Sequence, residues 1–403
     1  MILSFPPQNA WAQLTNKNER AVSFDLRSDT TKPEKYIPLK DLADVIKLLV
    51  NKTKKPDSDT IISGPVLSII PAIGYSLQTK LAGVISGNVA FRANKESRLS
   101  AISGNITYTQ NKQFYIPIQS NIWTKGNKYN LVGDFRFYKY PQSTFGLGSG
   151  STSTNEDPMD YKFARFYQVF YKKIKGPVYA GIGYIIDYRW DISHSGLANG
   201  AIADYDKYGP TGKSISSGIT LNALYDTRDN LINASKGFYT AIQLRNNLKS
   251  LGSNDNWHSL IFDIRKYIHL SKTSQNVLAF WSYNWLILKG HPPYLDLPSN
   301  GWDTYNCTGR GYIQGRFRGS KMMYLETEYR FRLVPNGLFG AVVFANAETF
   351  AAEQASSFQK IQPGFGAGLR IKLKKSSQTN LGIDYGFGTQ GSKGLFINVG
   401  EYF

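Results

Sequence analysis

The sequence predicts an all-β fold, an antiparallel transmembrane β-barrel of about sixteen strands, from three observations. From about residue 65 onward, apolar and polar residues alternate with a period of two, as in strands with one apolar and one polar face. The alternating segments mostly run for about 10–13 residues, which fits a tilted membrane crossing better than the ~5–6 residues of an ordinary strand. The connections between them fall into short turns and long polar loops.

The composition agrees with this fold. The chain has 403 residues, 14% of them aromatic, and 37 glycines, which suits many strands and turns better than packed helices. No window of about 18 apolar residues occurs, so the sequence predicts no transmembrane helix. A barrel strand needs only about 10 residues and hides its apolar face by alternation.

Lysine and arginine exceed aspartate and glutamate by 18, so the chain is strongly basic. This charge favours anionic lipid or a pore lined with positive charge as partners. A nucleic-acid partner is not predicted, because basic runs interleaved with aromatics and nucleic-acid fold signatures do not occur. Cys307 is the one cysteine, which leaves no intrachain disulfide and no cysteine metal cluster, and we predict no metal and no cofactor.

The N-terminal part divides into two predicted segments. We expect residues 1–37 to be extended, with 1–12 the remnant of a signal peptide that ends in Ala10-Trp11-Ala12. Residues 38–64 are expected to form an amphipathic helix and a linker. The apolar face of the helix consists of Leu39, Leu42, Val45, Ile46 and Leu49. This helix either packs on the following domain or plugs a pore.

The barrel is predicted to occupy residues 65–403. Its sixteen strands are expected at approximately 66–75, 82–93, 98–110, 113–124, 128–140, 160–173, 176–189, 213–227, 236–248, 257–268, 276–289, 321–332, 338–350, 362–374, 378–388 and 393–402. Short turns are Asn111-Lys112, Lys125-Gly126-Asn127 and Ile174-Lys175, and long loops are 141–159, 190–212 and 290–320. Short turns on one side and long loops on the other are typical of outer-membrane barrels, and closure removes edges that lipid could not satisfy.

Three stretches carry a more specific signal. The first is a strand end with Asp226, Arg228 and Asp229, followed by a Gly-aromatic strand start at Gly237-Phe238. The second is Arg310-Gly311-Tyr312, in the loop between the eleventh and twelfth predicted strands. The third is the final strand, which ends in Phe403 and has Asn398 and Gly400 five and three residues before it.

Together these stretches resemble the bacterial surface antigen barrel of the BamA/TamA superfamily of outer-membrane insertases and translocases, over roughly residues 65–403. The resemblance implies that the loop 290–320 folds back into the lumen and that Arg310 pairs there with acidic residues. Glu328 matches the first acidic position, with Glu326 on the same face of the strand. The second falls at Asn346, where the family usually has Asp, and Asp384 is a candidate substitute.

One departure from the family concerns the N-terminus. Its insertases and translocases carry POTRA domains before the barrel, whereas about 65 residues precede it here. We therefore expect a barrel-only member.

Three functions are open at this point. The first is insertion or translocation of protein or lipid across the bacterial outer membrane, through weak pairing of the first and last strands that Pro65 and Pro71 would weaken further. The second is a gated pore for small, anionic solutes with the N-terminal helix as plug. The third is a structural or partner-binding barrel, in which Lys207 and Lys213 contact lipopolysaccharide phosphates.

Expected partners are outer-membrane lipid, lipopolysaccharide, and a protein cargo or accessory protein, and no oligomeric state is predicted. We predict no enzyme, because the four histidines are scattered along the chain without a nucleophile at supporting spacing. The stretch from Gly146 to Gly150 has Gly148 where a nucleophile elbow needs serine.

Overall fold

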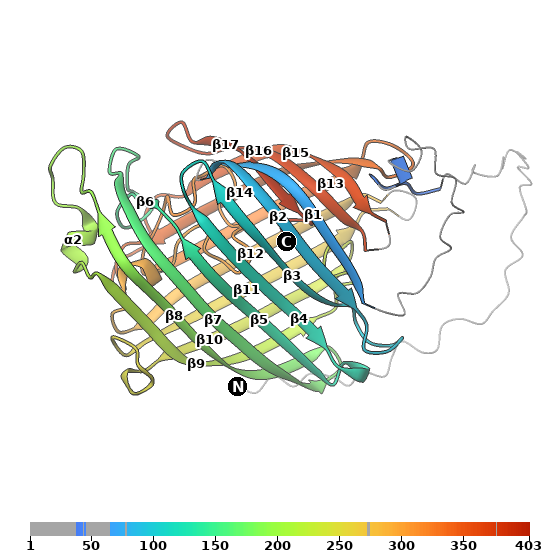
Figure 1. Ribbon diagram of the computed structural model, residues 1–403, viewed down its shortest axis with the longest axis horizontal. Coiled ribbons are helices and arrows are strands. Elements are labelled where there is room, and N and C mark those ends of the chain that lie inside the picture. The colour runs from blue at the N-terminus through green and yellow to red at the C-terminus, as the bar shows by residue number, and fades with distance from the viewer. Residues whose placement is uncertain (1–37, 43, 46–64, 77–78, 272–274, 376) are drawn as a thin grey trace, which may run out of the picture. The chain divides into compact units, whose positions relative to one another are not determined.

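The computed structural model describes residues 38–403 apart from 43, 46–64, 77–78, 272–274 and 376. Sixteen long antiparallel strands within these residues form a nearly closed barrel, which confirms the predicted fold class (Figure 1). None of the helices found in the described part of the chain is long and apolar enough to cross a membrane.

The elements follow the predicted boundaries closely. The long strands are β1 (Val66–Ser76), β2 (Lys80–Phe91), β3 (Ser100–Thr109), β4 (Phe114–Trp123), β5 (Tyr129–Lys139), β7 (Asp157–Lys175), β8 (Val178–His194), β9 (Lys213–Asp226), β10 (Gly237–Asn247), β11 (Trp257–His269), β12 (Val277–Lys289), β13 (Lys321–Arg332), β14 (Phe339–Ala351), β15 (Gln362–Lys374), β16 (Thr379–Phe387) and β17 (Lys393–Val399). The shorter elements are β6 (Gln142–Thr144), α2 (Asp204–Tyr208) and the 3-10 helices η1 (Lys125–Asn127), η2 (Lys249–Leu251) and η3 (Tyr294–Asp296). Three details were wrong: β8 ends at His194 rather than near residue 189, the last strand ends at Val399 rather than near residue 402, and Ile174 and Lys175 lie in β7, so the predicted turn falls at 176–177 instead.

Each long strand pairs antiparallel with the next one along the chain, from β1–β2 through to β16–β17, while β6 adds a short pairing to β7. The remaining neighbours are β1 and β17, which lie side by side where the barrel would close. Across the described residues, no hydrogen-bonded ladder joins these two strands. We call this junction the seam.

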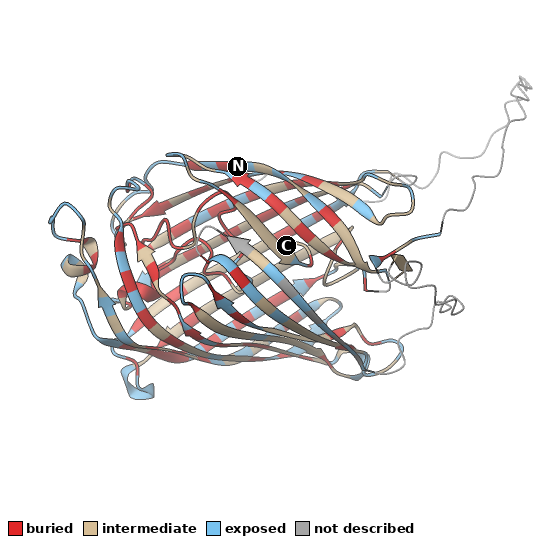
Figure 2. Ribbon diagram, turned by 45° about the horizontal axis from the view of Figure 1, so that its top comes forward, coloured by how far each residue is buried: buried red, intermediate tan, exposed pale blue. Residues whose placement is uncertain are grey.

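Alternation points one set of side chains, many of them charged, polar or aromatic, into the barrel and leaves a largely apolar set outside. On β13, Leu325 is 59% exposed on the outer face, whereas Glu326 and Glu328 point inward and are buried. Figure 2 shows the same banding of buried and exposed positions along many strands. Successive side chains of a strand point to opposite faces, so one period-two pattern serves both lipid and a polar lumen.

The two ends of the barrel differ. The connections 140–156, 195–212 and 290–320 lie at one end, called the long-loop end, and the connections 124–128, 176–177 and 375–378 lie at the other, called the short-turn end. The turn at Asn111-Lys112 lies at the long-loop end, so the expectation that all short turns share one side was wrong for that turn. The antiparallel strand order determines the end at which each connection lies, because successive connections alternate between the two ends whatever their length.

The described start of the predicted amphipathic helix rests on the short-turn end. The Lys40 amide donates to the Asn336 carbonyl oxygen over 3.0 Å, and the Lys375 amide donates to Asp41 Oδ2 over 3.0 Å. Leu42 and Val45 lie in a helical turn, and Leu39 approaches the turn at Gly337. Ile46, Leu49, the rest of the linker and the segment 1–37, with its signal remnant at 1–12, lie outside the described residues, so the plug stays a prediction.

Candidate functional site

The loop 290–320 between β12 and β13 is almost entirely buried, and it contacts two walls of the barrel. Its own structure is held by an isolated bridge between Ser299 and Arg318 and by the side chain of Asp303, which accepts from the amides of Cys307 (2.9 Å) and Thr308 (2.8 Å). A buried loop with no regular ladder must satisfy its backbone groups in this way. The loop backbone that leads to Arg310, at its tip, is therefore held in one conformation.

Arg310 lies among three carboxylates. Its Nη1 is 2.7 Å from Asp384 Oδ2, and its Nη2 pairs with Glu326 and Glu328. The arginine is 1% exposed. Its guanidinium also lies 3.8 Å from the Phe344 ring centroid, which shields the ion pairs from water. A planar guanidinium suits such a multidentate arrangement better than a lysine ammonium would.

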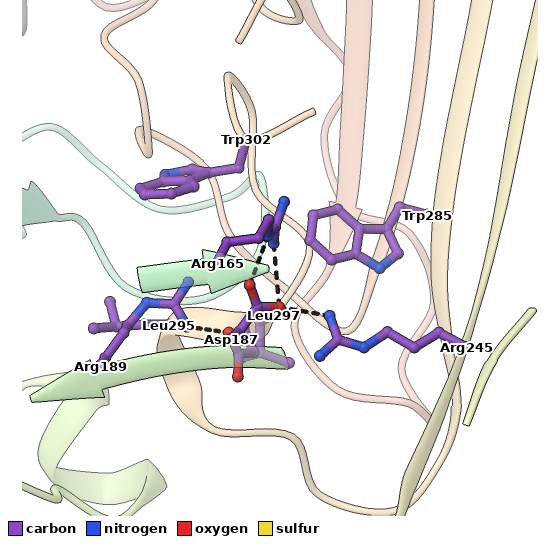
Figure 3. A pocket seen from close by; sticks show the side chains of 9 residues that line it. Arg165, Asp187, Arg189, Arg245, Trp285, Leu295, Leu297 and Trp302 are labelled. Atoms are coloured by element: carbon purple, nitrogen blue, oxygen red, sulfur yellow. Dashed lines mark hydrogen bonds and ion pairs between the residues drawn. The ribbon is translucent and has the colours of Figure 1, made fainter. Parts of the chain in front are cut away.

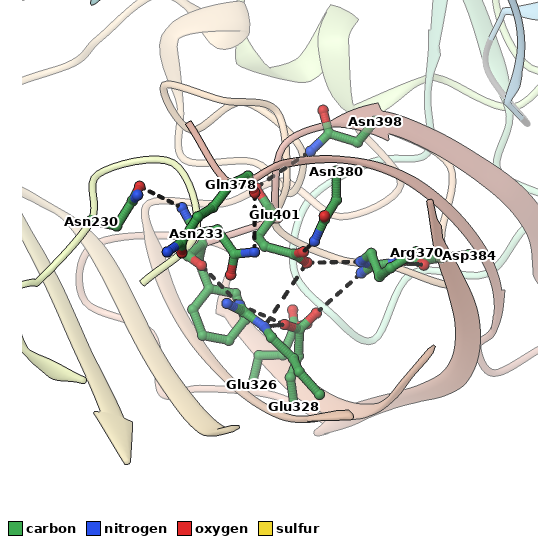
Figure 4. Close-up of polar contacts among 12 residues, drawn as sticks. Asn230, Asn233, Glu326, Glu328, Arg370, Gln378, Asn380, Asp384, Asn398 and Glu401 are labelled. Atoms are coloured by element: carbon green, nitrogen blue, oxygen red, sulfur yellow. Dashed lines mark hydrogen bonds and ion pairs between the residues drawn. The ribbon is translucent and has the colours of Figure 1, made fainter. Parts of the chain in front are cut away.

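Two further arginines complete this cluster. Arg330 Nη2 is 2.6 Å from Glu328 Oε2. Arg370 Nε is 2.7 Å from Glu401 Oε2 (Figure 4). We call the set the lock cluster; it comprises Arg310, Glu326, Glu328, Arg330, Arg370, Asp384 and Glu401. Burial alone would raise the pKa of Glu401, which lies beyond the last strand, but Arg370 and Arg330 outweigh burial and hold its pKa below the usual range.

The conformation of the loop tip depends on Gly311 and Tyr312. Gly311 has φ 107°, and a Cβ there would lie 2.6 Å from the Phe387 carbonyl oxygen, so only glycine fits. The Tyr312 hydroxyl donates to the Pro363 carbonyl oxygen over 2.6 Å and accepts from the Thr389 amide over 3.0 Å. The Arg-Gly-Tyr tip is thus held by the close approach at Gly311 and by the Tyr312 hydroxyl as well as by charge.

Asn346 contributes differently from the acidic residue that the resemblance implies at its position. Its Nδ2 donates to the backbone carbonyl oxygen of Arg310 over 2.9 Å, so it binds the loop backbone rather than the guanidinium. The second carboxylate comes from Asp384, the candidate substitute named from the sequence.

The chain end turns into the lumen. Gly400 has φ 108°, which ends the strand, and Phe403 stacks on Trp281 with ring centroids 5.2 Å apart. The Phe403 carbonyl oxygen accepts from Arg330 Nη2 over 2.8 Å, and Asn398 Nδ2 lies 3.4 Å from the Glu401 carbonyl oxygen. Burial of an aromatic ring and a hydrogen bond to a charged donor explain why the strand stops early.

The strand-end motif lies apart from the lock cluster, at the short-turn end. Asp226 pairs with Arg228 (Nε to Oδ1, 3.1 Å) and with Arg98 (Nη1 to Oδ2, 3.0 Å). Asp229 Oδ1 accepts from the Ser235 amide over 2.9 Å. These contacts fix the connection from β9 to β10, which makes the motif a structural element of the turn.

A second charged cluster, which the sequence did not reveal, holds the loop on the other side of the barrel. Arg165 and Arg245 each lie 2.6 Å from Asp187 (Figure 3). Arg189 pairs with Asp296 of the loop. The Ser216 hydroxyl also donates to Asp296 Oδ2 over 2.5 Å. We call the set the second anchor; it comprises Asp134, Arg136, Arg165, Asp187, Arg189, Arg245 and Asp296.

The second anchor also binds the loop backbone. Arg136 Nη2 donates to the carbonyl oxygens of Asp303 (3.2 Å) and Thr304 (2.9 Å). The cluster leaves a cavity of about 10 Å³, roughly the space of one water molecule. Its strands, β5 and β7–β10, lie across the sheet order from β13–β16, so the loop is held at two opposite walls.

Comparison with known proteins identifies the family. The model described as the Omp85 superfamily domain matches residues 86–403. The chain belongs to the Omp85 superfamily. The matched region shows no POTRA domain. No curated protein matches.

Solved structures share the fold of this Omp85 barrel at low sequence identity. BamA from Haemophilus ducreyi lacking POTRA domains 1–3 is 13% identical with a TM-score of 0.54, over 84% of this chain and 70% of that one. CdiB from Acinetobacter baumannii is 12% identical with a TM-score of 0.51, over 84% and 66%. CdiB from Escherichia coli is 10% identical with a TM-score of 0.50, over 84% and 68%.

Proposed function

We propose that this Omp85 barrel lies in the bacterial outer membrane and inserts or moves a protein or lipid by opening at the seam. The observation that carries the proposal is the lack, in the described part of the chain, of a ladder between β1 and β17. Unpaired backbone groups in lipid are unfavourable, and they are a template for an incoming strand.

The sequence of both seam strands favours weak pairing. Strand β17 has seven residues against eleven in β1, because Gly400 turns the chain away from the wall. Pro71 lies within β1 and has no backbone N–H to donate across the seam. A short strand beside a proline-containing one gives few hydrogen bonds to break.

The loop couples to the seam through the chain end. Arg310 of the loop lies 4.2 Å from the Tyr402 ring centroid, and Arg370 of the lock cluster pairs with Glu401. Release of the loop tip would therefore remove contacts that hold the residues directly after β17. This supports a role for the lock cluster in setting how easily the seam opens.

The test is to cross-link the seam. In a Cys307→Ser background, cysteine pairs joining Ile69 or Pro71 of β1 to Leu395 or Ile397 of β17 are oxidised in proteoliposomes. Insertion of an unfolded barrel protein is then measured. We expect oxidation to stop insertion and reduction to restore it. A cross-link between Val89 and Ile102, paired across β2 and β3, is the matched control and should have no effect. Full insertion with a locked seam would exclude the mechanism.

A gated pore is the second candidate. The observation that favours it is that Lys40 and Asp41 hydrogen-bond to turns of the short-turn end. Deletion of residues 1–60 should then raise single-channel conductance, with a preference for anions. Unchanged conductance would reject a plug in this segment.

A further inference from the structure

A band of exposed positive charge lies at the short-turn end. It occupies three consecutive connections at that end, β2–β3, β4–β5 and β7–β8, with the adjoining end of β7. We call it the basic rim; it comprises Arg92, Lys95, Lys125, Lys128, Lys172, Lys173 and Lys175.

The three connections form one continuous surface. The Arg98 amide donates to Asn127 Oδ1 over 2.7 Å, which joins the first connection to the second. The Lys173 amide donates to the Lys128 carbonyl oxygen over 2.9 Å, which joins the second to the third. The rim cations are therefore neighbours in space as well as alike in charge.

The charge of the basic rim is not compensated. Among the described residues, no carboxylate forms an ion pair with any of its seven cations, and Arg92 donates instead to the Ser97 carbonyl oxygen. Glu96 is the one exposed acid in the three connections.

Three lysines at the long-loop end pair with acids. Lys162 pairs with Asp191 at 2.7 Å, Lys207 with Asp204 at 3.1 Å, and Lys249 with Asp255 at 2.9 Å. The charges of these three lysines are thus compensated by neighbouring acids, unlike those of the basic rim.

The rim adjoins the apolar outer face of the barrel. Ile174, between Lys173 and Lys175, is 62% exposed, and Phe170, Val178 and Ile182 of the same hairpin are also exposed. Lysines beside such side chains can lay their methylene stems along the apolar surface and extend their ammonium groups to the headgroup level.

We propose that the basic rim binds the phosphate groups of anionic phospholipids in the leaflet at the short-turn end. Lysine ammonium groups on flexible side chains can follow the mobile phosphates of lipid headgroups. Basic clusters next to a membrane attract anionic lipid. An acidic protein is disfavoured as occupant because the cations border the lipid-facing band. The proposal rests on the membrane placement proposed above, but not on seam opening or on any cargo.

The test measures lipid binding directly. The purified barrel in a neutral detergent is titrated separately with phosphatidylglycerol and with lipopolysaccharide, and bound lipid is counted by native mass spectrometry. The rim variant changes Lys125, Lys128, Lys172, Lys173 and Lys175 to Gln. The matched control changes five exposed lysines of the long-loop end, Lys139, Lys207, Lys213, Lys249 and Lys289, to Gln. We expect affinity for phosphatidylglycerol to fall on the order of tenfold in the rim variant and to stay unchanged in the control.

Three results would overturn the proposal: unchanged affinity in the rim variant, equal loss in both variants, or loss of affinity for lipopolysaccharide in place of phosphatidylglycerol. The last would assign the phosphates to the opposite leaflet. Lys172→Gln/Lys173→Gln/Lys175→Gln, confined to one hairpin, should show a smaller loss in the same direction and serves if the larger variant does not fold. Because the readout is bound lipid, failure here leaves the insertion proposal standing.

Discussion

Asn346 donates its side-chain amide to the backbone carbonyl oxygen of Arg310 over 2.9 Å. The residue that replaces the expected acid thus holds the loop by its main chain, while Asp384 and the two glutamates of β13 hold the guanidinium. Loop position and loop charge are therefore fixed by different side chains, and each can be removed alone.

Removal of the Arg310 charge should destabilise the barrel strongly. Arg310→Ala leaves Glu326, Glu328 and Asp384 buried with less compensation, and breaking a buried pair typically costs about 3–5 kcal/mol. The measurement is the thermal unfolding midpoint from the heat-dependent gel shift. Arg310→Lys keeps the charge but loses the planar fork, so it should fall between wild type and Arg310→Ala. A midpoint for Arg310→Ala equal to wild type would contradict the lock.

Restoration of the family's acid at position 346 should be harmful here. Asn346→Asp removes the amide donor and sets a carboxylate against the Arg310 carbonyl oxygen, which leaves a buried acceptor unpaired at a cost of roughly 1–3 kcal/mol. Asn346→Ala should cost less, because it adds no charge. Urea midpoints of the two variants check the order, and an Asp variant as stable as wild type would show that the amide contact contributes nothing.

Gly311→Ala should destabilise the loop tip beyond the usual cost of a strained backbone, about 1–3 kcal/mol. The added Cβ meets the Phe387 carbonyl oxygen, whereas at Gly391, also at positive φ, a Cβ meets no atom within 4 Å. Gly391→Ala is therefore the matched control for strain alone. Equal unfolding midpoints for the two variants would mean that the close approach at Gly311 is relieved without cost.

Loss of the second anchor should loosen the loop at its other end. Asp296→Asn leaves Arg189 with a weaker partner, so we expect higher single-channel conductance with the barrel still folded. In the double variant with Arg310→Ala, the rise in conductance should exceed the sum of the two single effects, because in each single variant the remaining anchor still limits movement of the loop. Strict additivity would indicate that the two walls hold independent parts of the loop.

The Glu401 carboxyl predicts a dependence on pH. Its folded pKa lies below the unfolded value near 4.5, so its stabilising contribution is complete above that value and is lost as pH falls through the folded pKa. Glu401→Gln should thus lower the unfolding midpoint at neutral pH, and the difference from wild type should shrink on acidification below about pH 4.5. A difference that stays constant down to pH 3 would contradict this ionisation.

The sequence predicted the strands well because alternation is a local signal that each strand carries by itself. It also named the residues that meet Arg310, through the resemblance of short motifs. It did not predict that Asp296 meets Arg189, because the two lie on separate elements and only barrel closure brings them together. The inward turn at Gly400 was missed for the same reason, since the partner of Phe403 is Trp281 on a distant strand.

The loop between the two anchors connects opposite walls of the barrel across the lumen and thereby limits how far these walls can separate. It joins β8, through Asp296, to β13 and β16, through Arg310. The end of β17 is tied to the same wall by the Phe403 carbonyl oxygen. A widening that carried β16 and β17 outward would have to break one anchor, whereas a swing of β1 alone would break neither. We therefore expect the two sides of the seam to be unequal: β1 can move while both anchors are intact, whereas β17 can move only after the lock cluster has released it.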